Sequence, residues 1–323
     1  MTPERDWRPT ASLQHLKLRA RVLAEIRAFF CARGVMEVET PVLGAAAATD
    51  PHLESFQTRY QGPAAAQGRD LYLQTSPEFA MKRLLAAGSG PIYQICKAFR
   101  NGEAGRRHNP EFTLLEWYRP GFDHHALMDE VEALVDALLG CGAARRIRYR
   151  DLFLDRVGLD PFDFDAARAQ ACLQAHGVQV VLDDAEPDDW LNLILTHVIE
   201  PQLGEGAVFV HDFPASQAML ARLSADQPPL AQRFELYVNG MELANGFHEL
   251  SDAEVQRGRF EQDLQQRRWR GLPALPLDEA LIDALRHGLP DCAGVALGLD
   301  RLLMLAAGVE QLAEIMSFPY DRC

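Results

Sequence analysis

RNGEAGRRHNPEFTLLEWY, which runs from Arg100 to Tyr118, decides the fold class and points to the chemistry. Its first half is a polar loop rich in arginine that also carries His108. Its second half, residues 111–118, places acidic and aromatic residues at alternate positions and is typical of a β-strand. Residues 92–99, just before the loop, also predict a strand. Two strands around such a loop suit a polyphosphate held over a sheet, with a base stacked and an amine bound nearby.

Alternation along the second strand predicts the floor of a pocket. Side chains two residues apart share a face of a strand, so Phe112, Leu114, Glu116 and Tyr118 point the same way. Phe112 could stack on a base, Glu116 could bind an amino group and Tyr118 could contact a substrate. The alternative is a buried Glu116 that pairs with a nearby arginine.

Arginine side chains are the candidate phosphate ligands in this chain. The sequence contains neither GxxxxGK[ST] nor GxGxxG, which disfavours a P-loop enzyme and a Rossmann dehydrogenase. Arginine binds oxygens through a planar fork, and Arg100 at a strand end and Arg301 at a helix start are well placed for this. Each could instead form an ion pair, and His108 could be structural.

A predicted hairpin carries a second set of acidic residues. Asn239-Gly240 is a strong turn signal, and it joins strands predicted over residues 233–238 and 241–244. A two-residue turn is expected to place Tyr237 opposite Glu242, and Glu235 opposite Ala244, on one face of the sheet. Two neighbouring carboxylates repel unless a cation neutralises them, and beside phosphates the natural cation is Mg²⁺. The alternative is a pair of solvent-exposed acids.

Composition limits the class of protein. The 323 residues carry a net charge of -14, which argues against a broad nucleic-acid surface. The six cysteines show no metal-binding spacing and are typical of reduced cytosolic thiols. The N-terminus does not resemble a signal peptide, and no apolar run reaches the ~18 residues that span a bilayer. We therefore expect a cytoplasmic protein without a membrane segment.

The remaining patterns predict an α+β fold, a mostly antiparallel sheet flanked by helices. Helices are predicted from Ser12 to about Arg33, from Ser76-Pro77-Glu78 to about Ala87, over much of 121–200, from a capping box at Ser251–Glu254 to about Arg270, and from Asp300 to Gly308. Further strands are predicted at 35–39 and 294–298, and residues 44–48 are predicted to form a loop. The chain shows no convincing linker, so we expect a single domain over residues 1–323.

Five motifs, in their usual order, resemble those of class II aminoacyl-tRNA synthetases of the lysyl type. Residues 30–41, 100–118 and 294–301 are similar to motifs 1, 2 and 3, and residues 75–78 and 242–249 are similar to the substrate motifs of the lysine subclass. This resemblance covers nearly the whole chain. It implies an adenylate-forming catalytic core and, through motif 1, a homodimer.

Two departures from the synthetases point to a branch of this class. Motif 1 begins so early that no anticodon-binding OB-fold domain is expected before it, and Ala296 stands where the synthetases carry glycine. Both features resemble the elongation factor P lysine ligases. That resemblance implies ATP-dependent transfer of (R)-β-lysine, or lysine less well, onto a lysine side chain of elongation factor P, with no tRNA. The methyl group of Ala296 would favour an amino group one carbon further from the carboxylate.

The resemblance also implies roles for individual residues. The catalytic pair is Arg100 and Arg301, and Glu235 and Glu242 would hold Mg²⁺. ATP would contact Arg100, Asn101, Gly102, Glu103, His108, Asn109, Phe112, Glu242, Leu243, Gly298 and Arg301. The amino acid would contact Ser76, Pro77, Glu78, Glu116, Tyr118, Asn245, Glu249 and Ala296.

Two other functions fit parts of this pattern. A minimal lysyl-tRNA synthetase is disfavoured by the acidic composition, and a non-catalytic binding paralogue is disfavoured by the retained arginines and metal acids. The basic runs 145–150 and 267–270 read as solvated helix faces. Either run could instead dock an acidic protein such as elongation factor P.

Overall fold

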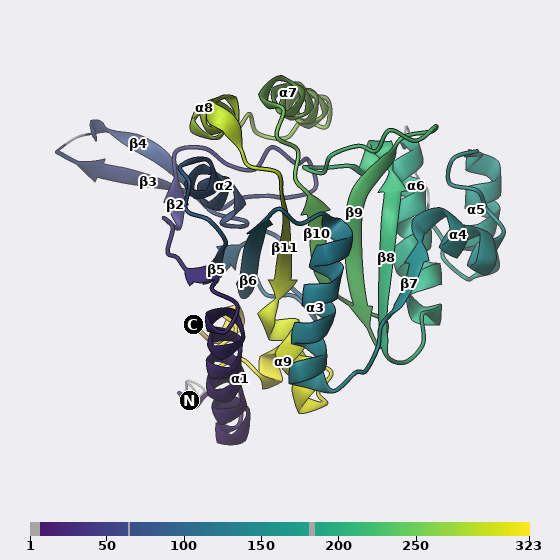
Figure 1. Ribbon diagram of the computed structural model, residues 1–323, viewed down its shortest axis with the longest axis horizontal. Helices are drawn as coiled ribbons and strands as arrows, with labels where there is room; N and C mark the ends of the chain where they lie inside the picture. Colours follow the sequence, from purple (N-terminus) through teal and green to yellow (C-terminus); the bar gives the residue numbers. More distant parts are fainter. Residues whose placement is uncertain (1–6, 64, 181–184) are drawn as a thin grey trace, which may run out of the picture. The chain divides into compact units, whose positions relative to one another are not determined.

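A computed structural model describes residues 7–63, 65–180 and 185–323 (Figure 1). Its internal contacts divide the chain into two compact units. Unit 1 comprises Met1–Tyr118, Ser251–Pro290 and Ala296–Cys323, and unit 2 comprises Arg119–Leu250 and Asp291–Val295. The single-domain interpretation stays a prediction. Within the segment 121–200, which was predicted to be largely helical, residues 181–184 lie outside the described residues.

Unit 1 holds two small groups of strands and most of the N- and C-terminal helices. Its strands are β1 (Met36–Glu37), β2 (Leu43–Gly44), β3 (Gln57–Gly62), β4 (Ala65–Leu73), β5 (Ile92–Phe99) and β6 (Glu111–Pro120). Its helices are α1 (Leu13–Cys31), α2 (Glu78–Ala86), α7 (Ala253–Trp269), α8 (Glu279–Gly288) and α9 (Leu299–Ala307), with short 3-10 turns at Leu312–Glu314 and Tyr320–Arg322.

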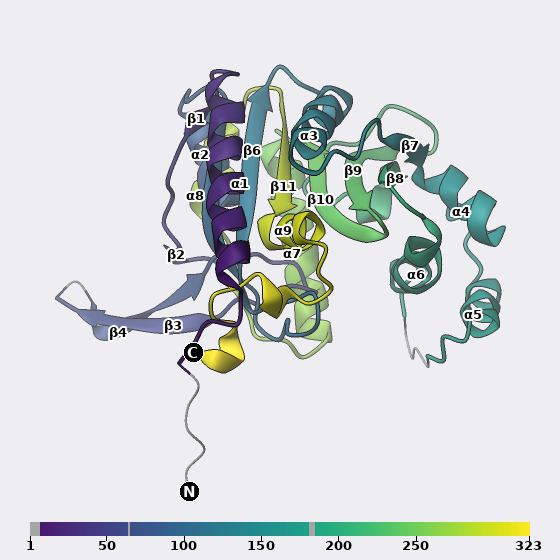
Figure 2. The ribbon, with the colours of Figure 1, turned by 90° about the horizontal axis from the view of Figure 1, so that it is seen from below.

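The centre of unit 1 is the antiparallel pair β5–β6, with β1 parallel to β5. Ser12 caps α1 by accepting the N–H of His15, as its sequence predicts. The apolar face of α1 packs against the strands: the Phe30 ring stacks on Tyr93 at 4.4 Å and meets Trp117 edge-on at 5.3 Å. Figure 2 shows α1 running alongside β6. These contacts bury Phe30 and Trp117 completely.

A second, three-stranded antiparallel sheet has the order β2-β4-β3. Its β3–β4 hairpin projects from unit 1 (Figure 1). The sequence did not predict this hairpin. The expected loop over residues 44–48 also proved wrong at its start, because Gly44 pairs with Tyr72.

In the described part of the chain, unit 2 contains four complete strands and the start of a fifth, and helices cover them. Its strands are β7 (Arg145–Arg148), β8 (Ala207–Pro214), β9 (Leu230–Val238) and β10 (Met241–His248). Its helices are α3 (His124–Leu139), α4 (Tyr149–Val157), α5 (Ala166–Ala175) and α6 (Pro187–Ile194), followed by a π-helical turn at Leu195–Ile199 and 3-10 turns at Glu200–Gln202 and Ala215–Gln217. Strand β11 (Cys292–Gly298) begins in unit 2 and ends in unit 1.

Within unit 2, β10, β9 and β8 are antiparallel neighbours, and β7 is parallel to β8. Figure 2 shows α3 and α6 on opposite sides of these strands. A buried apolar cluster joins α4, α5 and α6 to Val208, Val210 and Phe213 of β8. Antiparallel pairs therefore dominate both units and helices flank them, which confirms the predicted α+β class.

Three local predictions were wrong in detail. The first basic run is not a helix face, since Arg145–Arg148 form strand β7. Asp252, not Ser251, caps α7, because its carboxylate accepts the N–H groups of Glu254 and Val255. Pro77 occupies the N-cap position of α2, although the Ser76 hydroxyl still accepts the Glu78 N–H at 3.0 Å.

The second basic run contains a fully buried arginine. Arg267 is 0% exposed and binds the Glu54 carboxylate at 2.9 Å. It also donates to the carbonyl oxygens of Asp50, Leu53 and Pro273. The prediction of a solvated face is wrong at this residue, because a distant loop supplies acceptors for its guanidinium.

Candidate active site

Arg100 in unit 1 has the surroundings of a residue that binds an anion. Its guanidinium carbon lies 5.0 Å from the centre of the Phe112 ring, and its Nη1 lies 3.8 Å from a carboxylate oxygen of Glu103. The Nε atom is buried and has no hydrogen-bond partner among the described residues. Such a donor calls for an acceptor. The ion pair with Glu103 explains Arg100 poorly. The distance between the two charged groups is long, and the Nε atom of Arg100 still lacks a hydrogen-bond acceptor among the described residues.

The backbone fixes the base of the Arg100 loop. The Arg100 N–H donates to the carbonyl oxygen of Pro110 at 2.9 Å, and the Asn101 N–H donates to that of Glu54 at 2.8 Å. Gly102 has a φ of +83°, which only glycine adopts without strain. The loop therefore leaves β5 in a defined direction.

Asn109 anchors the other end of the loop. Its side-chain amide donates to the Glu111 carbonyl oxygen at 2.6 Å, and its side-chain oxygen accepts the Tyr320 N–H at 3.0 Å. Asn109 is buried, and these bonds tie the loop to the C-terminal turn. Its contact with ATP stays a prediction.

Arg301 lies beside His108. The Nη2 of Arg301 is 2.7 Å from the Nε2 of His108. The preceding residue, Asp300, is buried, pairs with Arg19 and accepts the Thr113 N–H at 2.7 Å. These bonds fix the first turn of α9 against β6. Both predicted phosphate ligands, Arg100 and Arg301, thus belong to the same unit as the strand that carries Phe112.

A hydroxyl–carboxylate group lies at the centre of the predicted amino-acid site. Glu116 is 2% exposed and accepts hydrogen bonds from Ser76 Oγ at 2.8 Å and from Tyr118 Oη at 2.7 Å. The predicted alternation of β6 is what brings Glu116 and Tyr118 to one face. A carboxylate already oriented by two hydroxyl groups is suited to an ammonium group.

Glu78 lies at the start of α2 and has a partner that the sequence reasoning missed. The Nζ of Lys82 is 2.6 Å from Glu78 Oε1, and Lys82 is almost wholly buried. The i,i+4 spacing of this pair was the available signal. Pro77, also predicted to contact the amino acid, lies between Ser76 and Glu78.

In unit 2, Glu235 is held by its neighbours on β9. Arg233 and Tyr237 both donate to its carboxylate, the latter at 2.5 Å. Arg233 also donates to Asn245 at 3.2 Å and to the Gln217 carbonyl oxygen at 3.0 Å. Sequence reasoning missed Arg233, although residues 233, 235 and 237 are spaced two apart and therefore share one face of a strand.

The hairpin register was half correct. Asn239 and Gly240 both have positive φ, and Glu242 lies opposite Tyr237 as predicted. Glu235, however, lies opposite Asn245 rather than Ala244, because β10 shifts register between Glu242 and Ala244. Leu243 fills this irregularity and is buried.

The two acids Glu235 and Glu242 still influence one another. Burial raises the pKa of Glu235, Arg233 opposes the rise, and the charge of Glu242 adds to it. The prediction of two exposed acids is wrong for Glu235, which is 7% exposed. Two carboxylates that repel in this way are a donor set that fits Mg²⁺.

The remaining residues predicted for the site lie on or directly after strand β10, or at the end of strand β11. Glu249 is 1% exposed and follows β10, which includes Asn245. Between them, a Cβ atom on Gly246 would lie 2.4 Å from the Phe234 ring, so only glycine fits there. Ala296 and Gly298 occupy the end of β11 in unit 1, and both are partly buried.

Known proteins resemble this chain along nearly its whole length. The profile of the family tRNA synthetases class II (D, K and N) matches residues 4–322. The chain belongs to this family. This class II chain is 52% identical to an elongation factor P--(R)-beta-lysine ligase from Yersinia enterocolitica, with all of both chains covered. It is 50% identical to proteins of the same name from Salmonella gallinarum and Salmonella typhi, again with full coverage.

Among the described residues, no helix of this class II synthetase relative combines the length and apolar character needed to cross a bilayer.

Proposed function

We propose that this chain is an ATP-dependent ligase that activates (R)-β-lysine, or lysine less well, and transfers it to a lysine side chain of elongation factor P. The observation that carries this proposal is full-length similarity, at 50–52% identity, to proteins named elongation factor P--(R)-beta-lysine ligase. The Ser76–Glu116–Tyr118 group supports it, because it suits an amino acid that carries an ammonium group.

The first step forms an acyl adenylate. A carboxylate oxygen of the amino acid attacks the α-phosphorus of ATP, and the bond from that phosphorus to pyrophosphate breaks. We assign Arg100 to the α-phosphate and Arg301 to the γ-phosphate. Phe112 stacks on the adenine, and Asn101, Gly102, Glu103, His108, Asn109, Leu243 and Gly298 complete the nucleotide contacts. Catalysis here consists of positioning and charge stabilisation.

Acidic residues select the amino acid. Glu78 takes the amino group near the carboxylate, and Tyr118 and Glu249 take the distal ammonium. A buried ammonium needs such a carboxylate partner. Ser76, Pro77, Glu116, Asn245 and Ala296 shape the remaining surface.

The second step transfers the acyl group. The neutral amine of the target lysine attacks the acyl carbon, an amide bond forms, and AMP leaves with the electrons of the broken acyl–phosphate bond. The attacking nitrogen loses a proton in this step. No described residue is assigned as the base.

Mg²⁺ is the proposed cofactor besides ATP, with Glu235 and Glu242 as its protein ligands. Bound there, it would neutralise phosphate charge. We also propose a cytoplasmic homodimer that forms through the α1–β1 region and has no tRNA substrate.

Intact mass analysis of elongation factor P tests the function. After incubation with this protein, ATP and (R)-β-lysine, we expect a mass gain of one lysyl group, with a smaller yield from lysine. Reactions without ATP, and with Arg100→Ala, serve as controls. Unmodified elongation factor P would contradict the proposal.

Two parallel assays separate the alternatives. Charging of tRNA with lysine, together with unmodified elongation factor P, would identify a minimal lysyl-tRNA synthetase. The absence of pyrophosphate exchange into ATP with either amino acid would identify a binding paralogue.

A further inference from the structure

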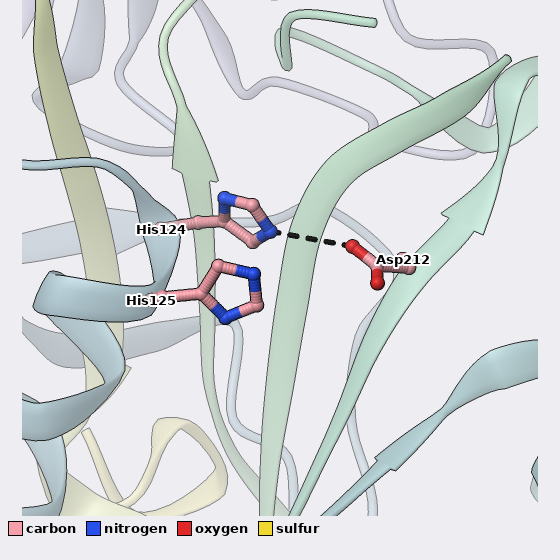
Figure 3. A group of neighbouring side chains, drawn as sticks. All are labelled: His124, His125 and Asp212. Atoms are coloured by element: carbon pink, nitrogen blue, oxygen red, sulfur yellow. Dashed lines mark hydrogen bonds and ion pairs between the residues drawn. The ribbon is translucent and has the colours of Figure 1, made fainter. Parts of the chain in front are cut away.

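Unit 2 contains a histidine–aspartate cluster that the proposed ligase reaction does not use. His124, His125 and Asp212 each offer one ligand atom, and these three atoms lie within 4.8 Å of one another (Figure 3). The Nε2 of His124 is 3.3 Å from Asp212 Oδ1. The rings of His124 and His125 lie side by side, with centroids 4.1 Å apart.

A β-bulge brings the aspartate to this cluster. Val208 and Val210 of β8 face the apolar cluster of α4–α6, so regular alternation would send residue 212 the same way. The register of β8 against β9 shifts between His211 and Phe213, and Asp212 has a φ of +59°. Across this shift β9 carries one residue more than β8, and Phe213 rather than Asp212 faces the apolar cluster. The alternation of β8 therefore breaks at Asp212, and its carboxylate lies with the histidines instead. Bulges commonly re-aim a side chain in this way.

The two histidines come from the first turn of α3. Asp123 caps this helix by accepting the Ala126 N–H at 2.8 Å, which fixes the backbone of His124 and His125. His124 is 4% exposed. Two imidazole groups and a carboxylate thus converge from a capped helix and from the irregular part of β8.

The protein does not satisfy all the ring nitrogens in this cluster. The Nδ1 of His124 is buried and has no hydrogen-bond partner among the described residues. The Nδ1 of His211 forms no hydrogen bond of good geometry within the described part of the chain either, although it lies 3.0 Å from Asp212 Oδ2. Buried polar atoms without partners are rare and call for an explanation, such as a water or an ion. The Nδ1 of His124 lies on the other side of the ring from Nε2, which faces Asp212 (Figure 3), so of these two atoms it is the His211 nitrogen that adjoins the cluster.

Other charged groups lie near the cluster but leave it accessible to an ion. Arg148 Nε lies 3.6 Å from Asp212 Oδ2, but its side chain is 65% exposed and can move into solvent. The His248 ring stacks near His124 at 6.4 Å and is itself bonded to Gln232 and Asp291. Arg148 is thus the one nearby cation that an incoming ion would displace, as far as the described residues show.

We propose that His124, His125 and Asp212 bind a late first-row divalent transition metal, with Zn²⁺ as the expected ion. Imidazole and carboxylate ligands in this number suit zinc with one position left for water or for His211. Zinc–ligand bonds of about 2.0–2.2 Å require ligand atoms roughly 3.3–3.5 Å apart in a tetrahedron. The three ligand atoms lie within 4.8 Å of one another, so side-chain rotations must bring them closer together for the ion to bind.

Cobalt spectroscopy of the full chain tests the site. After chelator treatment and dialysis, Co²⁺ is added without nucleotide and the visible absorption is followed. We expect one Co²⁺ per chain, displaced by Zn²⁺, and a Zn²⁺-dependent rise of several degrees in the unfolding midpoint. His125→Ala and Asp212→Asn should each weaken Zn²⁺ binding by roughly 100-fold or more.

Two controls make the result specific. His197→Ala removes an exposed histidine of the same unit, and Glu242→Gln alters the proposed Mg²⁺ carboxylates. Both should bind Zn²⁺ like the unmodified chain. The site is refuted if the unmodified chain shows no cobalt absorption, or if His125→Ala and Asp212→Asn bind as tightly as the controls. This readout does not depend on ligase activity, so the two proposals fail separately.

Discussion

The ammonium of Lys82 lies 2.6 Å from the carboxylate of Glu78, one turn away on α2, and the two side chains are only 2% and 15% exposed. Removing two charges from water is costly, and here each charge offsets that cost for the other. The pair therefore fixes the carboxylate that we assign to the substrate amino group.

Lys82→Met should destabilise unit 1 by about 3–5 kcal/mol, because it leaves the buried carboxylate of Glu78 without this partner. Lys97→Met is the matched control: its ion pair with Glu111 is 3.1 Å long, but the side chains are 46% and 51% exposed. We expect a loss below about 1 kcal/mol there. Denaturant unfolding measures both, and equal losses would contradict the role of burial.

Tyr118→Phe should raise the KM for the amino acid by about tenfold, since it removes a hydrogen bond to the charged Glu116. The KM for ATP should stay unchanged. Tyr237→Phe is the matched variant, because it removes the equivalent bond to Glu235. It should alter the Mg²⁺ dependence instead. Pyrophosphate exchange at varied amino acid, ATP and Mg²⁺ distinguishes the two, and identical effects would refute separate roles.

The sequence predicted β5 and β6 well because both strands are long and a polar loop separates them. Strand β8 went unpredicted. Its run of consecutive apolar residues from Ala207 to Val210 is buried on both faces, so it shows no alternation. The bulge at Asp212 depends on tertiary packing and has no local signature.

In the candidate site, too, local sequence patterns predicted some residues and tertiary contacts determined the others. Strand alternation identified Glu116 and Tyr118, and the turn signal identified Glu242. Buried partners such as Arg233 were missed because a charged residue within a strand reads as exposed until its acceptors are known. Arg267 shows the extreme case, since its acceptors on Asp50, Leu53 and Glu54 lie more than 200 residues earlier in the chain.

Arg100→Lys should lower kcat/KM for adenylate formation by roughly 10²–10³-fold, because an ammonium cannot replace the planar fork. Arg106→Ala, in the same loop, is the control. Its side chain is 59% exposed and pairs with Glu310. We expect it to change the rate less than about twofold, in line with the small worth of exposed pairs. Comparable losses in both variants would show that loop structure, not phosphate binding, explains the effect.

Ala296→Gly should move the preference from (R)-β-lysine toward lysine. One methyl group in a pocket is worth about 1–3 kcal/mol, and we expect the lower end of this range here. The ratio of the two kcat/KM values should therefore change by up to about tenfold. The KM for ATP reports whether the end of β11 is otherwise intact. An unchanged ratio with normal ATP binding would show that Ala296 does not set the preference.

Asp263 gives the stability of unit 1 a pH dependence. Burial raises its pKa from 3.8 to about 6, and a 2.7 Å hydrogen bond from Thr49 only partly opposes this. Between these values the folded chain keeps a proton that the unfolded chain has released. Stability contributed by this group is therefore present below about pH 4 and lost as the pH rises through 6.

Asp263→Asn should remove this dependence, because an amide can still accept the Thr49 hydrogen bond but cannot ionise. Each pKa unit corresponds to about 1.4 kcal/mol, and partial exposure reduces the total, so the variant should gain about 1–2 kcal/mol near pH 7 and nothing near pH 4. Unfolding midpoints across this range measure the difference. Asp321→Asn, at an exposed aspartate, should show no such trend. A gain in Asp263→Asn that is independent of pH would mean that improved packing, not ionisation, is the cause.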